Sequence, residues 1–123
     1  MDIYREHIID HYKNPRNFGH LQGSKKSSHD ENPSCGDHIS MDILFENGII
    51  TDIRFSGEGC AISIASASML TEMVKGKKIT KIATLDFSDI QKMLGIEITP
   101  ARKRCAMLPV MVLKKLILKE FKK

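Results

Sequence analysis

Residues 38–55 read HISMDILFENGIITDIRF, and this stretch decides the fold class of the chain. Apolar and polar side chains alternate on both sides of the dipeptide Asn47-Gly48. Such alternation predicts strands with one buried face, and Asn-Gly favours the tight turn that joins two antiparallel strands. The apolar positions are Ile39, Met41, Ile43 and Phe45 before the turn and Ile49, Ile53 and Phe55 after it. The stretch therefore predicts a β-hairpin, which Ser56-Gly57-Glu58-Gly59 brings to an end.

Helical patterns surround the hairpin. Gly76 and Gly95 are expected to stop two of the helices, and Asp86 or Ser88 to cap the shorter one. Because proline suits only the first turn of a helix, Pro109 is expected to open the main C-terminal helix, with residues 100–108 as a turn or a separate short helix. The expected helices span residues 3–13, 60–75 or 61–75, 87–94 and a segment that starts near Pro109.

Between the first helix and the hairpin, residues 14–34 are polar and read as a long loop, with a short strand near Lys25–His29. The chain has no internal repeat and no linker of low complexity. The predicted fold class is α+β, with a small antiparallel sheet and helices packed on it. A length of 123 residues fits one domain over 1–123.

The composition excludes several classes of protein. With 41% hydrophobic and 28% charged residues the chain is globular rather than disordered. Its apolar runs are too short for a membrane span, and the first residues lack the apolar stretch of a secretory signal, so we expect a cytoplasmic protein that does not bind membranes. An odd count of three cysteines in that setting predicts reduced thiols rather than disulfides.

The positive charge is concentrated at the C-terminus. Residues 101–123 hold eight basic residues and one acidic residue, a net +7, so the rest of the chain sums to −3 within the total of +4. A basic segment of this kind favours an anionic partner. Nucleic acid is not expected, because tryptophan is absent and only 6% of residues are aromatic.

Each cysteine has neighbours that favour the thiolate. Cys35 precedes Gly36-Asp37, which can bring a carboxylate to the same point. Cys60 opens a predicted helix, whose N-terminal dipole lowers a thiol pKa. Cys105 follows the cations Arg102, Lys103 and Arg104, which have the same effect. Taken singly, each residue also fits an ordinary buried cysteine.

Taken together, the three cysteines predict a metal site that tertiary structure assembles. Their separations match no zinc-finger spacing, and three thiolates need one more ligand for tetrahedral zinc. The expected metal ligands are Cys35, Asp37, Cys60 and Cys105, with Asp37 the most readily exchanged because a carboxylate is the hardest donor of the four. His38 follows Asp37 directly and is expected to be a reserve ligand or a group that lies next to the ligands. Arg102, Lys103 and Arg104 are expected to offset the negative charge and to steer anionic groups.

Four motifs in order carry a family resemblance. They read DHYKNPRN over 10–17, NPSCGD over 32–37, GEGCAISIASAS over 57–68 and PARKRCA over 100–106. The chain resembles the U-type iron–sulfur cluster assembly proteins, the IscU/SufU family with its NifU N-terminal-like relatives, almost end to end. The resemblance implies an antiparallel sheet of about three strands in an α+β sandwich, with the four expected ligands clustered at one tip.

The resemblance also implies the function. At its ligand motifs the chain is similar to the SufU branch, because Arg104 stands where the scaffold branch has histidine. That branch binds zinc and accepts persulfide sulfur from a SufS/IscS-like cysteine desulfurase, with Cys35 as first choice for acceptor and Cys105 as runner-up. Downstream iron–sulfur assembly or recipient proteins are then further partners. The stretch 76–100, however, is too short for the insertion usual in SufU-like proteins.

Alternative functions remain open at this point. An IscU-type scaffold would assemble a two-iron cluster on the same residues, so an iron–sulfur cluster is the alternative cofactor to zinc. A structural zinc module that binds an anionic partner through its basic C-terminus is a third reading. A cysteine hydrolase ranks last, because no motif places a histidine as base beside a cysteine.

Overall fold

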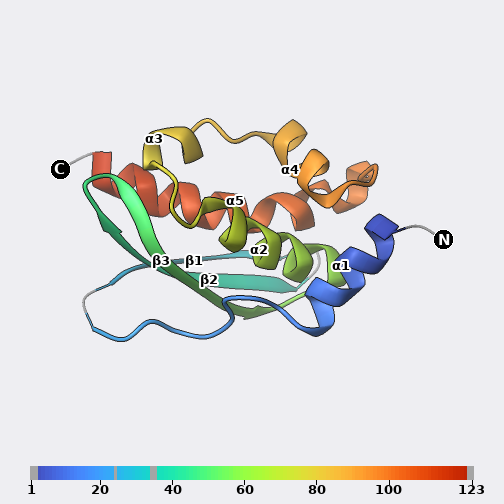
Figure 1. Ribbon diagram of the computed structural model, residues 1–123. Coiled ribbons are helices and arrows are strands. Elements are labelled where there is room, and N and C mark those ends of the chain that lie inside the picture. Colours follow the sequence, from blue (N-terminus) through green and yellow to red (C-terminus); the bar gives the residue numbers. More distant parts are fainter. Residues whose placement is uncertain (1–2, 24, 34–35, 122–123) are drawn as a thin grey trace.

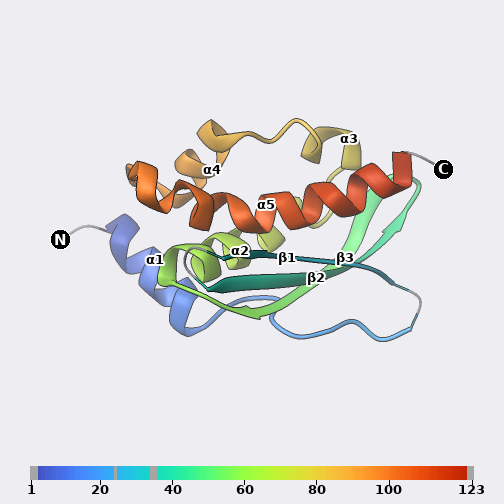
Figure 2. The ribbon, with the colours of Figure 1, turned by 180° about the vertical axis from the view of Figure 1, so that it is seen from behind.

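The computed structural model describes residues 3–23, 25–33 and 36–121. Strands β1, β2 and β3 form one antiparallel sheet in that order, and Figures 1 and 2 show helices α2 and α5 covering one of its faces. The α+β class predicted from the sequence is therefore confirmed. The elements are α1 (Ile3–Lys13), β1 (Lys26–Asn32), β2 (Asp37–Glu46), β3 (Ile49–Glu58), α2 (Ala61–Val74), α3 (Ile79–Ile82), α4 (Phe87–Leu94) and α5 (Pro100–Phe121).

The predicted hairpin is confirmed as β2 and β3. Asn47 and Gly48 both have positive φ, as a tight hairpin turn requires. The prediction that residues 56–59 end the second strand is wrong, since β3 continues to Glu58. Gly57 pairs with Ile39 there at a φ of 141°, and a side chain on it would collide with the backbone carbonyl of His38. The glycine thus permits close pairing where the sequence suggested a break.

The edge strand β1 is longer than predicted. It runs over Lys26–Asn32 and pairs with β2 along its whole length, from Lys26 opposite Ile43 to Asn32 opposite Asp37. Its sequence, KSSHDEN, carries no apolar alternation. Strand formation therefore comes from pairing with β2 and from packing against α5. The sequence of β1 alone does not indicate these long-range contacts.

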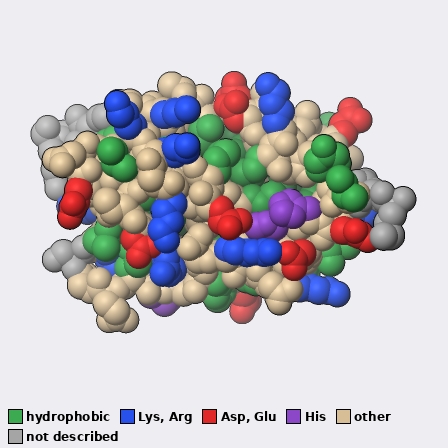
Figure 3. Space-filling view, in the orientation of Figure 1, with side chains coloured by type: hydrophobic (Ala, Val, Ile, Leu, Met, Phe, Trp, Pro, Cys, Tyr) green, Lys and Arg blue, Asp and Glu red, His purple; other side chains and the backbone are tan. Residues whose placement is uncertain are grey.

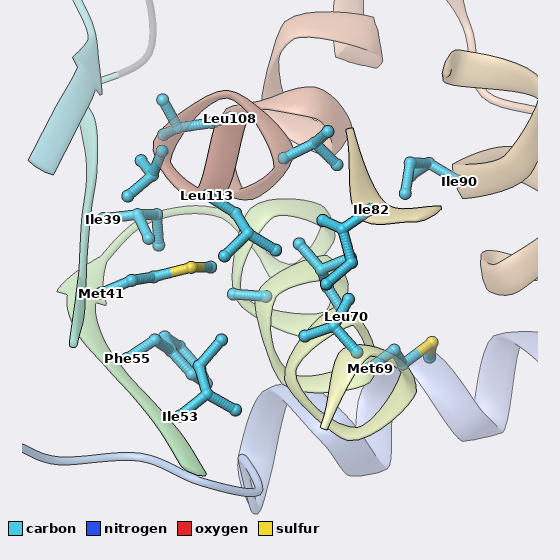
Figure 4. Close-up of a cluster of buried hydrophobic side chains, with 14 of the residues drawn as sticks. Ile39, Met41, Ile53, Phe55, Met69, Leu70, Ile82, Ile90, Leu108 and Leu113 are labelled. Carbon is cyan, nitrogen blue, oxygen red and sulfur yellow. The ribbon is translucent and has the colours of Figure 1, made fainter. Parts of the chain in front are cut away.

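The core lies between the sheet and the two long helices. Figure 4 shows Met41 and Phe55 of the sheet facing Leu70 of α2 and Leu113 of α5. All four side chains are 0% exposed. Helix α2 lies so close to its neighbours that even its small residues are fully buried, namely Ser63, Ala65, Ser66, Ala67 and Ser68.

The C-terminal helix differs from its prediction. Instead of starting near Pro109, α5 runs without interruption over Pro100–Phe121 with Pro109 inside it. Proline removes one backbone N–H and costs a helix interior about 3 kcal/mol. Burial of Ala106, Val110 and Leu113 against α2 and the sheet outweighs that cost. Residues 100–108, which carry the motif around Cys105, therefore belong to the same helix as the segment that follows Pro109.

The predictions for the remaining helices are confirmed only in part. Helix α4 is confirmed, with Asp86 in a capping box and Gly95 in the left-handed conformation. Helix α2 ends differently, because Lys75 is extended and the Gly76 N–H donates to the Ile50 carbonyl. The one-turn helix α3 was not predicted. Among the described residues no helix combines the length and apolar character that crossing a bilayer demands.

Candidate metal centre

Three chain segments that are distant in sequence meet at one end of the sheet. Asp37 is the first residue of β2, Cys60 immediately precedes α2, and Cys105 lies in the second turn of α5. Figure 1 shows these three elements beginning at the end of the sheet nearer α1. The carboxylate oxygen and the two sulfur atoms all lie within 4.8 Å of one another. Asp37, Cys60 and Cys105 are called the thiol–carboxylate cluster below.

Asp37 is fixed by the backbone that precedes α2. Its side chain is 1% exposed, and Oδ1 accepts a hydrogen bond of 3.0 Å from the Cys60 N–H. The second oxygen, Oδ2, lies 3.9 Å from the Cys60 Sγ. Gly59 makes room for this approach, because a Cβ there would stand 2.8 Å from Oδ1. The carboxylate is thus held beside the thiol rather than turned to solvent.

Cys60 is the N-cap residue of α2, yet its side chain does not cap the helix. Burial of the thiol acts to raise its pKa, but hydrogen bonds from the Ser63 backbone and from the side chains of Cys105 and Ser63 outweigh burial and lower it. The Cys60 Sγ lies 3.8 Å from the Ser63 Oγ, whose hydroxyl donates to the Cys60 carbonyl. The helix start therefore favours the thiolate.

Cys105 is completely buried in α5. The next residue, Ala106, accepts a 2.7 Å hydrogen bond through its carbonyl from the Ser66 hydroxyl, which joins this turn of α5 to α2. Arg102 lies on the solvent side of the same turn. Its pKa is raised, first by a hydrogen bond to Cys60 and then by the attraction that the Cys60 and Cys105 thiols exert when they are ionised. One cation therefore accompanies the two sulfur atoms.

The other predicted site residues lie around this cluster or outside it. Cys35 falls outside the described residues. His38 points away from Asp37, as neighbours on a strand do, and its Nε2 lies 3.9 Å from Glu58 Oε2. Lys103 places its ammonium 4.8 Å from the centre of the Phe87 ring, and Arg104 is exposed.

Sequence reasoning assigned no role to Ser63 and did not identify the group that approaches Gly59. Ser63 lies three positions after Cys60, the spacing that brings side chains together in the first turn of a helix. The glycines before Cys60 predict that another group approaches the backbone there, and the structure identifies the group beside Gly59 as the Asp37 carboxylate. Both signals were present in the spacing of the second motif.

The donor set fits a thiophilic divalent metal. Zinc binds sulfur at about 2.3 Å and carboxylate oxygen at about 2.0–2.2 Å, so tetrahedral ligand atoms stand about 3.5–3.8 Å apart. The Cys60 Sγ and Asp37 Oδ2 are already 3.9 Å apart, and all three ligand atoms lie within 4.8 Å of one another. A buried carboxylate beside two thiols is otherwise a costly arrangement.

Comparisons with known proteins agree on one family. The NifU-like N terminal domain model matches residues 3–123. The zinc-dependent sulfurtransferase SufU of Bacillus subtilis is 41% identical over 96% of this chain and 91% of its own length. The iron–sulfur cluster assembly scaffold protein IscU of Haemophilus influenzae is 40% identical over 85% of each chain.

A solved structure supports the same grouping. The putative iron–sulfur cluster assembly scaffold protein for the SUF system from Fervidobacterium islandicum superimposes with a TM-score of 0.77 at 29% identity, covering 91% of this chain and 94% of that one. The alignment with SufU spans 135 positions, more than the 123 residues of this chain. The relative therefore has residues that this chain lacks.

Proposed function

The chain belongs to the family of NifU-like N-terminal domains, the iron–sulfur cluster assembly proteins of the SufU and IscU type, and we propose that it acts there as a zinc-bound sulfur acceptor. The observation that carries the proposal is the thiol–carboxylate cluster, in which two thiols and a buried carboxylate converge within 4.8 Å. The relative with 41% identity is named a zinc-dependent sulfurtransferase. The partner we propose is a SufS/IscS-like cysteine desulfurase.

Asp37, Cys60 and Cys105 would hold the metal together with Cys35. Zinc would keep its sulfur ligands deprotonated at neutral pH and protect them from oxidation. The chain contributes the geometry. The Cys60 backbone fixes Asp37, and Ser66 holds the turn of Cys105 against α2. Arg102 would balance part of the negative charge that three thiolates and a carboxylate place around one divalent ion.

Sulfur transfer follows thiol exchange chemistry. The Cys35 thiolate attacks the outer sulfur of the persulfide on the desulfurase, forming a new S–S bond. The S–S bond of the donor breaks, and its electron pair leaves on the cysteine of the desulfurase as a thiolate. No oxidant or reductant is consumed. Cys105 is the alternative acceptor, but its complete burial makes it less accessible to a partner in this structure.

A scaffold that assembles a two-iron cluster is the second candidate. The chain is shorter than the SufU alignment and 40% identical to an IscU named as a scaffold, which favours this reading. The same donors suit both groups, because thiolates bind iron–sulfur clusters as well as zinc.

Metal analysis separates the two functions. A sulfur acceptor should be purified colourless with one zinc per chain and should stay colourless after anaerobic incubation with iron, sulfide source and desulfurase. A brown, oxygen-sensitive product with iron and sulfide in equal amounts would instead support the scaffold. The variant Asp37→Ala should weaken metal binding under either function, but less than the loss of a thiolate would, because a carboxylate is the most readily exchanged of the four ligands.

A further inference from the structure

Two adjacent hollows lie on the side of α2 that is turned away from the sheet. The larger, of about 680 Å³, lies between α1, α2 and α4, and the smaller, of about 210 Å³, lies between α2 and α3. Met73 and Leu85 line both hollows, so the two are continuous neighbours. They are called the methionine groove after the residues of the floor, Met69, Met73, Leu85 and Met93. The groove is separate from the thiol–carboxylate cluster, because Met69 lies nine residues after Cys60, roughly 13 Å along a helix axis.

The floor of the methionine groove is apolar surface that the described chain leaves partly uncovered. Figure 4 shows the Met69 side chain directed away from Met41 and Phe55 of the core. Met73 lies on the same face of α2 one turn later and is partly exposed, as are Leu85 and Met93. Figure 3 shows hydrophobic side chains gathered in the middle of this face, beside the histidines. Methionine side chains adapt to the shape of what they contact, so they are common at surfaces that receive a partner.

The two ends of the methionine groove carry opposite charge. At the α3 end, Lys77 and Lys81 line the smaller hollow, and neither makes an ion pair with any of the described residues. At the α1 end, Glu72 and Asp89 line the larger hollow together with one cation, Lys92. The Glu72 side chain is 53% exposed, so its carboxylate is accessible. A partner that complements both ends has an acidic group and a basic group on either side of an apolar part.

These features fit a segment of a protein. A small ligand is buried over most of its surface when it binds, whereas this groove is open to solvent. An amphipathic helix presents aliphatic side chains at positions i, i+3, i+4 and i+7, which suits an elongated apolar groove bounded by helices. Acidic residues at the N-terminal end of such a helix and basic residues at its C-terminal end also complement its dipole. The charge distribution of the groove therefore agrees with that of a stable helix.

We propose that the methionine groove binds an amphipathic helix of a partner protein, whose aliphatic side chains contact the groove floor, whose acidic end meets Lys77 and Lys81, and whose basic end meets Glu72. The floor starts at Met69, beyond the first turns of α2, so a helix bound there leaves the thiol–carboxylate cluster accessible. The surface therefore suits a partner that stays bound while another protein reaches the cluster.

The test uses an acetylated and amidated peptide, Glu-Glu-Ala-Leu-Gln-Ala-Leu-Leu-Gln-Ala-Leu-Ala-Lys-Lys, titrated into the full chain and followed by the methionine methyl signals in NMR spectra. We expect saturable shifts of Met69, Met73 and Met93. Met107 and Met111 of α5 serve as internal controls and should not shift. Replacing the two central leucines by glutamine should abolish saturable binding, because burial of apolar surface supplies the affinity. Met73→Ala should weaken binding of the original peptide, whereas Met111→Ala should not.

The double variant Lys77→Glu, Lys81→Glu tests the charge at the α3 end. It should weaken binding about tenfold, because two attractions become repulsions. The melting temperature should stay the same, since both side chains are exposed. A second peptide, with lysines in place of the two glutamates, should show the reverse order, with weaker binding to the wild type and tighter binding to the variant. Lys13→Glu, Arg104→Glu is the matched control, because it changes the net charge equally outside the groove and should bind like the wild type.

Three results would overturn the proposal. The first is the absence of saturable shifts of the three groove methionines. The second is the same order of affinity for the two peptides in the wild type and in the charge-reversed variant. The third is a shift of the same methyl signals when the protein alone is concentrated, which would show that a second copy of this chain covers the groove. Zinc content and sulfur acceptance are measured without the peptide, so their outcome is independent of this one.

Discussion

Two buried polar clusters lie along the same helix, α2, and they are built in opposite ways. At its start, the thiol–carboxylate cluster gathers three acidic groups around Cys60. Near its middle, His11 of α1 contacts Ser68 and Glu72, and these three residues are called the histidine cluster. Asp37 is 1% exposed and His11 is 2% exposed. Burial is therefore equal, and the difference lies in how the polar atoms are satisfied.

In the histidine cluster, the buried polar atoms find their hydrogen-bond partners within the protein. The His11 Nδ1 lies 2.7 Å from the Ser68 Oγ, which also accepts the Arg16 N–H at 2.8 Å. The Ser68 proton is then free to point to Nδ1, which leaves the imidazole proton on Nε2, 3.7 Å from Glu72. Burial first, and then the neighbouring Arg16 and His7, lower the His11 pKa, which favours the neutral ring. Figure 3 shows histidine side chains beside apolar ones on this face.

The groups of the thiol–carboxylate cluster do not balance one another's charge. Its members are acids that repel one another once ionised, and Arg102 approaches from the solvent side. A neutral, hydrogen-bonded set stabilises a fold, whereas converging acids call for a cation. The histidine cluster therefore fixes α1 on α2, whereas the thiol–carboxylate cluster has the donor atoms to hold a metal ion. Substitutions in the thiol–carboxylate cluster should therefore change zinc affinity and leave stability largely unchanged. Substitutions in the histidine cluster should do the reverse.

The largest expected effect is on metal binding. Cys60→Ser should weaken zinc affinity at least about 100-fold, since a hydroxyl does not replace a thiolate ligand. The free energy of unfolding of the metal-free protein should stay unchanged or rise by about 1 kcal/mol, because serine is a preferred N-cap and Cys60 makes no cap hydrogen bond. Zinc titration and urea unfolding measure the two quantities. A large loss of metal-free stability would contradict the comparison.

The reverse signature is expected at the histidine cluster. His11→Ala should lower the free energy of unfolding by about 2–3 kcal/mol, through the lost hydrogen bond and the cavity left behind. Zinc affinity should change less than twofold. His7→Ala is the matched control, because His7 is exposed one turn earlier on α1 and should cost less than about 0.5 kcal/mol. If His11→Ala released the metal, the two clusters would not be independent.

A smaller effect tests the space beside Asp37. Gly59→Ala places a Cβ against Ser63 and the Asp37 carboxylate, so zinc affinity should fall about tenfold as the carboxylate shifts. Gly23→Ala is the control. Its φ of 79° makes a side chain strained but no atom lies within 4 Å, so stability should fall while zinc affinity stays the same. If Gly59→Ala and Gly23→Ala bound zinc with equal affinity, Gly59 would have no role at the site.

The smallest effect is a pH dependence. Because the folded-state pKa of His11 is lowered, the unfolded chain binds more protons below its ordinary pKa near 6.5. Stability from this group is complete above that pH and is lost as pH falls, by at most about 1.4 kcal/mol between pH 7.5 and 5.5. His11→Asn should flatten the slope in denaturant unfolding. An unchanged slope would mean that His11 is not buried neutral.

The sequence predicted the hairpin and α4 well because their signals are local. Alternation around Asn47-Gly48 and the cap of Asp86 act within a few residues. It failed at β1 and at Pro109, where long-range packing decides. β1 is a strand through its pairing with β2, and α5 is continuous because Ala106 and its neighbours are buried.

For the site, the sequence indicated the right kinds of residue but not all of their partners. Asp37, Cys60 and Cys105 converge as expected. The unpartnered amide of Asn32 was not foreseen, since an asparagine before proline reads as turn chemistry. Burial of a polar side chain depends on α5, which is distant in sequence.

The central claim, that this cluster serves sulfur acceptance, is tested by a single-turnover transfer. The zinc-loaded protein is mixed with a SufS-type desulfurase and cysteine, and intact and peptide masses are recorded before and after thiol alkylation. We expect one added sulfur atom on the peptide that contains Cys35, and none on Cys35→Ala. It would be contradicted if the desulfurase kept its persulfide while the wild-type chain gained no sulfur.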